Sequence, residues 1–501
     1  MSEVKVNKVS PRSGTTLTIG DSGDTTNIVG TLQNNGSELV GDISSVVAGT
    51  GLSGGGTSGA VTLNSDLLAK QAGTNFTNSL LVGTSSTGTL NDANSNTGVG
   101  IGVFGALTTG DNNVAVGLNA LDVNTTGCFN TALGASTLLV NQTGICNVAI
   151  GASALRCNTA SNNIAVGVQP LYYNTSGTNN TAIGTKALFC NTTADNNTAL
   201  GYNSLLNNTT GAANTALGIH AMEKNISGGI NVATGAYSLA CNTTGADNTA
   251  NGGYAMKENT TGTGNVGVGR SALRCNTTGG SNVAVGCGAL CLNTTASDNV
   301  AVGRNAMLGT TTGASNLAAG TSAMQCNTTG ASNTALGGNS TMFANTTGAN
   351  NVAVGLSALQ SNTTADENTA VGRGALAANT TGTPNTAVGS LTLTANTTGG
   401  SNTAMGRQSM QANTTGSYNV AVGRCSLKAN TTANSNVAIG TESLDVNTTG
   451  ADNTAVGTNA LGANTTGAQN VAIGSSSLAA NTIGDQNVAI GQNSLDSNTE
   501  G

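Results

Sequence analysis

An Asn followed by x-Ala-x-Gly recurs every seventeen residues from position 96 almost to the end of this chain, in 24 copies. The spacing departs from seventeen only between Asn147 and Asn163, where it is sixteen, and between Asn333 and Asn351, where it is eighteen. Such a short, fixed period predicts one extended array of stacked units and not a set of globular domains. We number the positions of each unit from this Asn, as slots one to seventeen.

The individual slots are strongly restricted. Slots one and five are Asn and Gly in all 24 units, and slot three is Ala in all but two, which have Gly98 and Gly267. Slot nine is Leu or Met in 22 units, with Phe104 and Thr341 as exceptions. Met342 directly follows Thr341, so one inserted residue explains both that exception and the long spacing. Slots twelve to fourteen are usually Asn-Thr-Thr.

The apolar slots two to five predict a short β-strand. Its residues are apolar or very small on both faces, which is typical of a strand covered on both sides. Seventeen residues are too few for a βαβ unit, which needs about 30, but they suffice for one coil of a parallel β-solenoid. We therefore expect an all-β solenoid or β-roll of about 24 coils, in which Asn side chains bond to Asn and Thr side chains to Thr along the stack.

Charged residues indicate which slots face water. Most of them occur in slots six, seven, ten, sixteen and seventeen, and none occurs in slots two to five. We expect slots two and four to fill the coil interior and slots three and five to point outward, against another chain. The opposite orientation is the alternative, with the Val-rich face shared between chains. In either case a long apolar surface predicts a parallel homo-oligomer.

The composition excludes several classes of protein. Charged residues make up 7% of the chain and aromatic residues 2%, and the net charge is −7. No basic stripe could hold nucleic acid, and no run of 18 apolar residues could span a membrane. The first residues, MSEVKVNKVSPRSG, lack the apolar core of a signal peptide.

Several motifs resemble catalytic or cofactor sites, but each lacks the partner residues or the context that such a site needs. Gly20-Asp21-Ser22-Gly23 resembles a serine-protease turn, but the only His is His220, in slot seven of the array. The stretch 100–105 matches G-x-G-x-x-G only because Gly100 is a slot-five glycine. No pair of acids recurs at one slot, so a glycosidase lacks its carboxylates. We expect no enzyme activity, no catalytic residues and no cofactor site.

The ten cysteines predict free thiols and no metal site. Five of them occupy slot eleven, where other units have Ala, and no two of those five lie in adjacent coils. Cys287 and Cys291 have no second pair or nearby His to complete a zinc site. The many N-x-T triplets are in phase with the repeat, which favours ladders over glycosylation. The slot-eleven cysteines are Cys157, Cys190, Cys241, Cys275 and Cys326.

Two resemblances to known families cover most of the chain. The phrase N-V-A-I-G, as in 147–151, 436–440 and 487–491, resembles the head repeats of trimeric autotransporter adhesins, which implies a left-handed, trimeric parallel β-roll. The N-terminal stretches 6–30 and 43–67 resemble openings and linkers of tail-fibre proteins from marine tailed phages, which often carry such arrays. These fibres often end in a chaperone domain, whereas this sequence stops inside a repeat.

We therefore interpret residues 1–40 as a virion-attachment segment, 41–95 as a Gly/Ser-rich stem or linker, and 96–501 as the solenoid shaft. The expected function is that of a phage tail fibre or similar virion appendage that mediates or supports host attachment. Its partners would be two further copies of itself, a virion protein at the N-terminus and a host receptor, with carbohydrate as one candidate. The alternatives are a bacterial trimeric surface adhesin, disfavoured by the lack of a visible signal peptide and membrane anchor, and an ice-binding solenoid.

Overall fold

The computed structural model describes 75–83 and 87–500 in full, together with strand segments at 33–34, 37–38, 52–54, 63–65 and 69–73. Most of the expected attachment segment and of the linker, including Gly20–Gly23, lies outside the described residues. The chain divides into two compact units, Met1–Ala69 and Lys70–Gly501.

The first unit contains two small antiparallel pairs. Strand β1 (Gln33–Asn34) pairs with β2 (Ser37–Glu38), and β3 (Leu52–Gly54) pairs with β4 (Leu63–Ser65).

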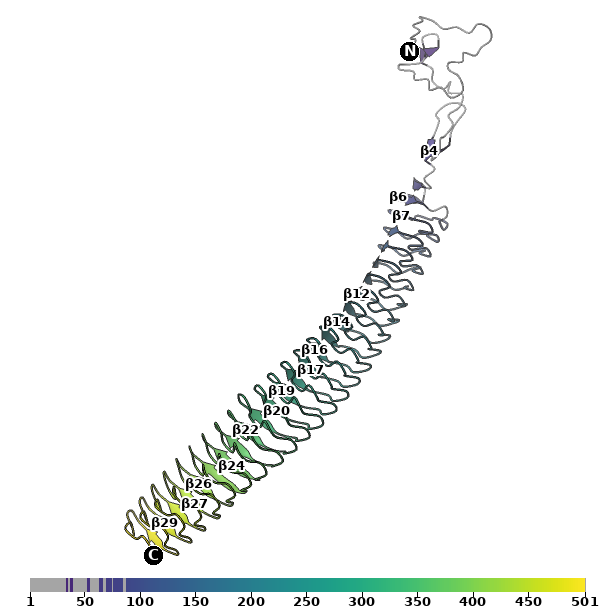
Figure 1. The fold of residues 1–501 in the computed structure, drawn as a ribbon. Coiled ribbons are helices and arrows are strands. Elements are labelled where there is room, and N and C mark those ends of the chain that lie inside the picture. Colours follow the sequence, from purple (N-terminus) through teal and green to yellow (C-terminus); the bar gives the residue numbers. More distant parts are fainter. Residues whose placement is uncertain are drawn as a thin grey trace, which may run out of the picture. The chain divides into compact units, whose positions relative to one another are not determined.

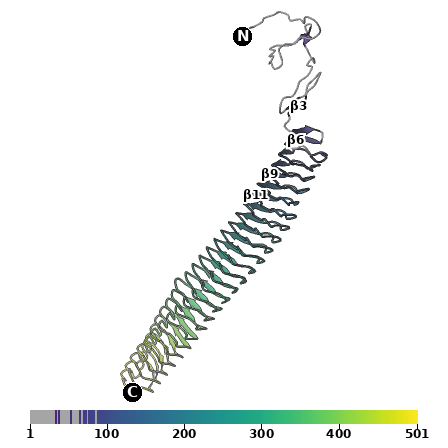
Figure 2. The same ribbon diagram turned by 45° about the vertical axis from the view of Figure 1, so that its right-hand side comes forward.

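The second unit is a parallel β-solenoid, as the sequence predicts. It contains β5 (Ala69–Gly73) and then one parallel sheet from β6 (Phe76–Val82) to β30, in which each strand pairs with the next along the chain. Figures 1 and 2 show the coils stacked side by side into an elongated, gently curved body, with no helix among the described residues. The strands after β6 are β7 Thr97–Val99, β8 Val114–Val116, β9 Thr131–Leu133, β10 Val148–Ile150, β11 Ile164–Val166, β12 Thr181–Ile183, β13 Thr198–Leu200, β14 Thr215–Leu217, β15 Val232–Thr234, β16 Thr249–Asn251, β17 Val266–Val268, β18 Val283–Val285, β19 Val300–Val302, β20 Leu317–Ala319, β21 Thr334–Leu336, β22 Val352–Val354, β23 Thr369–Val371, β24 Asn385–Val388, β25 Asn402–Met405, β26 Val420–Val422, β27 Val437–Ile439, β28 Thr454–Val456, β29 Val471–Ile473 and β30 Val488–Ile490.

Equal slots lie beside each other throughout the sheet. Ala284 pairs with Ala301, for example, and the register is kept where the spacing is sixteen (Ala149 with Ala165) or eighteen. The inserted residue near Thr341 is absorbed in the turn, and Met342 takes the buried slot-nine position, as expected. Identical residues in stacked coils therefore contact each other, which is what turns a repeat into a continuous core.

The sheet begins one strand before the first Asn of the array. Leu80 of β6 pairs with Thr97, which places Ser79 and Leu81 in slots one and three of an additional coil. Leu81 is fully buried, and a Cβ on Gly98 would collide with its Cδ1. This explains why slot three of the next coil is Gly98 and not Ala.

The orientation of the strand is opposite to the one we expected first. Slot-three alanines such as Ala284 are fully buried, whereas slots two and four point outward. The reason is that slot nine already fills the interior: Leu290 is fully buried, and the Cβ of a residue in place of Gly267 would lie 3.2 Å from Met256 Cε. Only a methyl group fits opposite that side chain, so the larger Val, Leu and Ile side chains point away from the coil.

Two ladders of buried Asn run along the interior, and the expected Asn–Asn bonds are present. In one coil, Asn265 and Asn276 each donate from Nδ2 to the same Gly279 carbonyl oxygen at 2.9 Å. Asn265 also donates from its backbone and side chain to Asn248 Oδ1 of the preceding coil (3.0 and 3.1 Å), and Asn276 donates to Asn259 Oδ1 (2.8 Å). In most coils, slots one, twelve and fifteen are thereby tied together and to the next coil. The second Asn is replaced in two coils, by Leu107 and Thr310.

We expected threonine side chains to bond to one another along the stack, and this prediction is wrong. In slot thirteen the hydroxyl donates to the backbone carbonyl of the next coil, as from Thr243 Oγ1 to Thr260 O (3.1 Å) and from Thr277 to Thr294 O (3.0 Å). The backbone of this turn also bonds between coils, from Thr243 N to Thr260 O (2.9 Å). The threonine hydroxyl therefore adds one more donor to a carbonyl oxygen that already accepts from the backbone of the preceding turn.

The Asn ladder can be tested at one coil. Asn362 donates to Asn345 Oδ1 (2.8 Å) and to the Ala365 carbonyl (3.0 Å), and it accepts from Asn379 (3.2 Å). We expect Asn362→Ala to lower the free energy of unfolding by about 1–3 kcal/mol for each buried group that it leaves without a partner. Gln360→Ala, at an exposed position of the same coil, is the control and should change the thermal melting curve little. Equal melting curves for the two variants would contradict the role of the ladder.

All slot-five glycines except Gly337 end the strands in a conformation that other residues rarely adopt. Gly372 has a φ of +134°, and a Cβ there would collide with the carbonyl of Gly389 in the next coil. The backbones of neighbouring coils therefore approach each other closely at slot five, and the positive φ adds a second restriction. Together they exclude even Ala from this slot.

We expect Gly372→Ala to reduce the thermal stability of the array, and Gly372→Val to disrupt it further. Gly338→Ala is the matched control, because its φ is not in the positive range and a Cβ would lie 3.7 Å from Leu356 Cδ1, an ordinary contact. Circular dichroism melting of the three variants measures the effect. A Gly372→Ala protein that melts like the Gly338→Ala protein would contradict the close-approach argument.

Candidate functional surfaces

The outward face of the sheet is a long apolar surface, which we call the strand face and define as slots two and four of all coils. Slot four is Val, Leu, Ile or Met in all but three coils, which have Thr234, Asn251 and Ala319, and slot two is mostly Val or Thr. Large side chains are partly open to solvent here: Leu133 is 46% exposed and Val302 42%. The face carries no charged residue.

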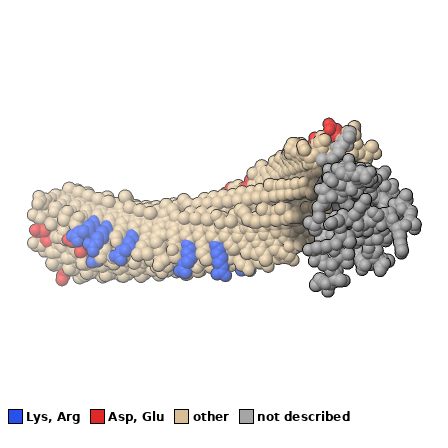
Figure 3. All heavy atoms as spheres, turned by 90° about the horizontal axis from the view of Figure 1, so that it is seen from above, with Lys and Arg blue, Asp and Glu red and all other residues tan. Residues whose placement is uncertain are grey.

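A second surface, which carries polar and charged side chains, lies along the turn that follows each strand. We define this turn edge as slots six, seven and ten, the positions that the charge pattern predicts to face water. Arginines in slot six, such as Arg270 and Arg304, are exposed, whereas slots seven and ten are mostly half-buried. Figure 3 shows basic side chains in separate patches along one face, with uncharged surface between them. This edge therefore differs from coil to coil while the interior does not.

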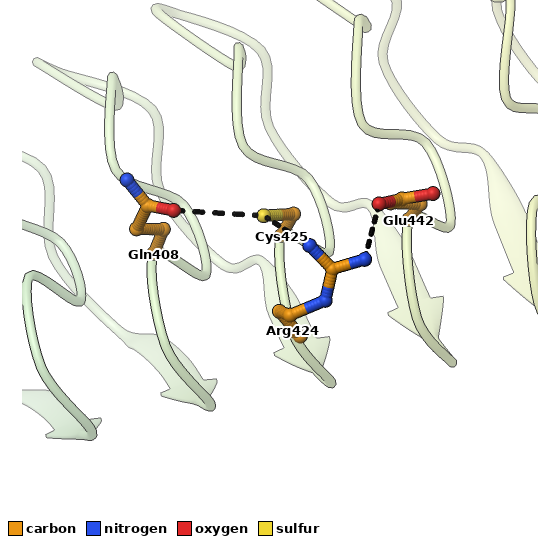
Figure 4. A network of polar contacts seen from close by, with 4 residues as sticks. All are labelled: Gln408, Arg424, Cys425 and Glu442. Carbon is orange, nitrogen blue, oxygen red and sulfur yellow. Dashed lines mark hydrogen bonds and ion pairs between the residues drawn. The ribbon is translucent and has the colours of Figure 1, made fainter.

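One polar network illustrates how this edge is built (Figure 4). Gln408, Cys425 and Glu442 occupy slot seven of three successive coils, and Arg424 stands beside Cys425 in slot six. The Cys425 thiol donates to Gln408 Oε1 at 3.8 Å, and Arg424 forms an ion pair with Glu442. Both charged side chains are about half exposed, so the pair contributes little to stability.

Aromatic rings form a continuous stack on the turn edge of four coils. His220, Tyr237 and Tyr254 occupy slot seven of successive coils, and their rings stack with centroid distances of 5.0 and 5.4 Å and interplanar angles of 13° and 7°. Tyr202, in the preceding coil, contacts His220 edge-on at 5.3 Å. Three aromatic residues spaced seventeen apart indicate this stack in the sequence, but we did not predict it.

A second aromatic group lies in the two coils before that of Tyr202. Tyr172, Tyr173 and Phe189 contact one another with centroid distances of 4.7 to 5.3 Å. Arg156 lies over the Tyr172 ring and donates to its hydroxyl (3.0 Å), and Lys186 lies over the Phe189 ring. Five of the six tyrosines and the only histidine are thus concentrated between positions 172 and 254.

The ten cysteines are all free, as the sequence predicts. Burial raises the pKa of the thiols of Cys190, Cys241 and Cys291, and for Cys241 the nearby Glu258 carboxylate raises it further. A raised thiol pKa lowers the thiolate fraction and hence the reactivity. The thiols of these three cysteines are therefore less reactive than an exposed thiol.

The residues singled out in the sequence do not converge on a catalytic constellation. His220 is half-buried in the aromatic stack, with Nδ1 3.0 Å from Glu223 Oε2. Gly100 follows strand β7, and a turn, not a helix, comes next. Within 87–500 no three His, Cys, Asp or Glu side chains are grouped as metal ligands would be. In the same range no helix is long and apolar enough to cross a membrane.

Neither a protein-family model nor a curated protein matches this chain.

Proposed function

We propose that this protein is a structural fibre of a tailed-phage virion, a tail fibre or similar appendage, that supports or mediates attachment to the host surface. The observation that supports the proposal is the one-dimensional architecture. The 24 coils extend the chain in one direction, and their interior side chains pack against the neighbouring coils. At about 4.8 Å per coil, such an array spans roughly 115 Å. We propose no enzymatic activity.

The remaining parts of the proposal follow from the resemblances. The N-terminal stretches 6–30 and 43–67 resemble openings and linkers of phage tail fibres. On this basis we assign the N-terminal segment to binding a virion protein and the array to a position outside the cell, where it would meet a surface receptor. Nucleic acid and lipid bilayers are not among the proposed partners.

The array would assemble as a parallel homotrimer through the strand face. An uncharged surface of Val, Leu, Ile and Thr that runs along every coil is far larger than the apolar patches that monomers usually expose. A second copy presents the same face in the same register, and closed symmetric assemblies are the commonest way to cover such a surface. The resemblance to adhesin heads and phage fibres favours three copies over two.

Native mass spectrometry of the purified chain tests the assembly, with a trimer expected. Val352→Lys combined with Val354→Lys places two charges on the strand face and should shift the protein toward monomer at low concentration. Leu356→Lys, in the same coil but on the turn edge and 47% exposed, should leave the assembly unchanged. A monomeric wild-type protein would contradict the shared face, and a dimer would contradict the trimer alone.

Immunogold electron microscopy tests the function, with an antibody against the purified chain applied to virions and to cells of the organism that encodes it. Label on virion appendages is the expected result. Label confined to the cell surface would support the bacterial adhesin instead. The ice-binding alternative draws some support from the outward-facing slot-two threonines, such as Thr97 and Thr131. Thermal hysteresis in a freezing assay would support the ice-binding function and contradict the proposed role as a phage fibre.

A further inference from the structure

A small hollow opens on the turn edge where the aromatic stack ends. Its volume is about 270 Å³, and it is lined by Tyr254, Arg270, Ser271 and Arg274. The three residues after Tyr254 belong to the next coil, in slots six, seven and ten. The volume lies just below the range of pockets for drug-sized ligands, which begins near 300 Å³, and suits a single six-membered ring.

The hollow occupies the place of the next ring in the stack. The rings of His220, Tyr237 and Tyr254 cover one another in slot seven, so the last free aromatic face is the side of Tyr254 toward the following coil. Slot seven of that coil is Ser271, and in the coil after it is Gly288. A ligand ring placed above Ser271 would continue the stack.

Two arginines line the hollow together with Tyr254. Over residues 87–500, neither Arg270 nor Arg274 forms an ion pair or a cation–π contact. Arg156 and Arg424, by contrast, have a Tyr172 hydroxyl and a Glu442 carboxylate as partners. The two guanidinium groups together offer ten N–H donors and no acceptor, so they are suited to an anion.

The carboxylate of the preceding coil does not fill this role. Glu258 is paired with Lys257, whose Nζ lies 2.9 Å from Oε1. The hydrogen bond from Lys257 is the largest cause of the lowered pKa of the Glu258 carboxyl, and the positive charges of Lys257 and Arg274 lower it further. The charges of that pair cancel, so the two arginines leave the hollow with a local excess of positive charge.

We propose that this hollow binds a pyranose ring that carries a carboxylate, as the acidic residue of a surface glycan. The C–H groups on one face of a pyranose carry partial positive charge and pack against the negative face of the Tyr254 ring. The carboxylate would accept hydrogen bonds from Arg270 and Arg274, and the Ser271 hydroxyl lies where it can bond a ring hydroxyl. The proposal deepens the adhesive function and rests on it only for the biological origin of the glycan.

A saccharide with isolated acidic residues fits better than nucleic acid. The chain has a net charge of −7, and the hollow is lined by just two arginines and one aromatic ring. A polyanion would meet repulsion from the rest of the molecule and would need a basic groove to follow its backbone. One acidic sugar in a largely neutral glycan needs only the local site.

The direct test fills the hollow. Ser271 has a φ of +59°, and Tyr237 and Tyr254 adopt nearly the same φ in the same slot (+58° and +61°), so Ser271→Tyr extends the stack without strain. Ser322→Tyr, also in slot seven with a φ of +54°, is the matched control away from the aromatic stack. Saturation-transfer NMR and calorimetry measure binding of glucuronate, galacturonate and N-acetylneuraminate glycosides to the full chain.

We expect the wild type and Ser322→Tyr to bind at least one of the acidic glycosides at millimolar concentration, and Ser271→Tyr to lose binding. The methyl esters of the same sugars should bind about tenfold or more weakly, because they lack the charge that the guanidinium groups recognise. The double substitution Arg270→Gln with Arg274→Gln should have the same effect as esterification. Arg304→Gln, at an exposed slot-six position without a neighbouring ring, should bind like the wild type.

Three outcomes would overturn the proposal: no binding of any acidic glycoside, binding that survives in Ser271→Tyr, or binding of uridine monophosphate as tight as that of the sugars. The arginine variants keep the test informative if Ser271→Tyr fails to fold. The result is independent of the immunogold experiment, because a virion fibre without this site would still label virions, and a cell-surface protein with the site would still bind the sugar.

Discussion

The buried Asn pair found in nearly every coil is the interaction on which the rest of the structure depends. Asn265 and Asn276 both donate to one carbonyl, that of Gly279, and bond to their counterparts in the preceding coil. A buried amide is tolerated only when its groups are satisfied, and here the partners are supplied by identical coils above and below. One coil alone could not bury these side chains, so the coil and the array form together.

This internal network leaves room for only a thin apolar core. Slot three contributes a methyl group and slot nine a Leu or Met, and both are fully buried in nearly every coil. The turn places slot nine in the left-handed region, with Leu273 at a φ of +51°, a conformation that is unfavourable for most residues. Burial of the side chain against two neighbouring coils offsets this cost, which explains why slot nine varies so little.

The slots outside this network are free to differ, and that is where function can be placed. The strand face is uniform along the array and suits a partner with the same repeat. The turn edge changes with each coil: a polar network around Cys425, an aromatic stack that ends at Tyr254, and basic residues in separate patches. A solenoid can therefore carry a local binding site without altering its fold, because a change in slot six or seven does not reach the interior.

The repeat by itself determined the solenoid, its period and the Asn ladder, because a seventeen-residue period with Asn and Gly in fixed slots places the same side chains beside each other in stacked coils. The tertiary structure decided which strand face is inside. A strand of three residues with Ala on one face and Val on the other is apolar on both, and only the space left by slot nine excludes Val285 from the interior while admitting Ala284. The stack that ends at Tyr254 and the pairing of Arg270 with Arg274 around it also needed the stacked coils, since residues seventeen apart become neighbours only when the register is known.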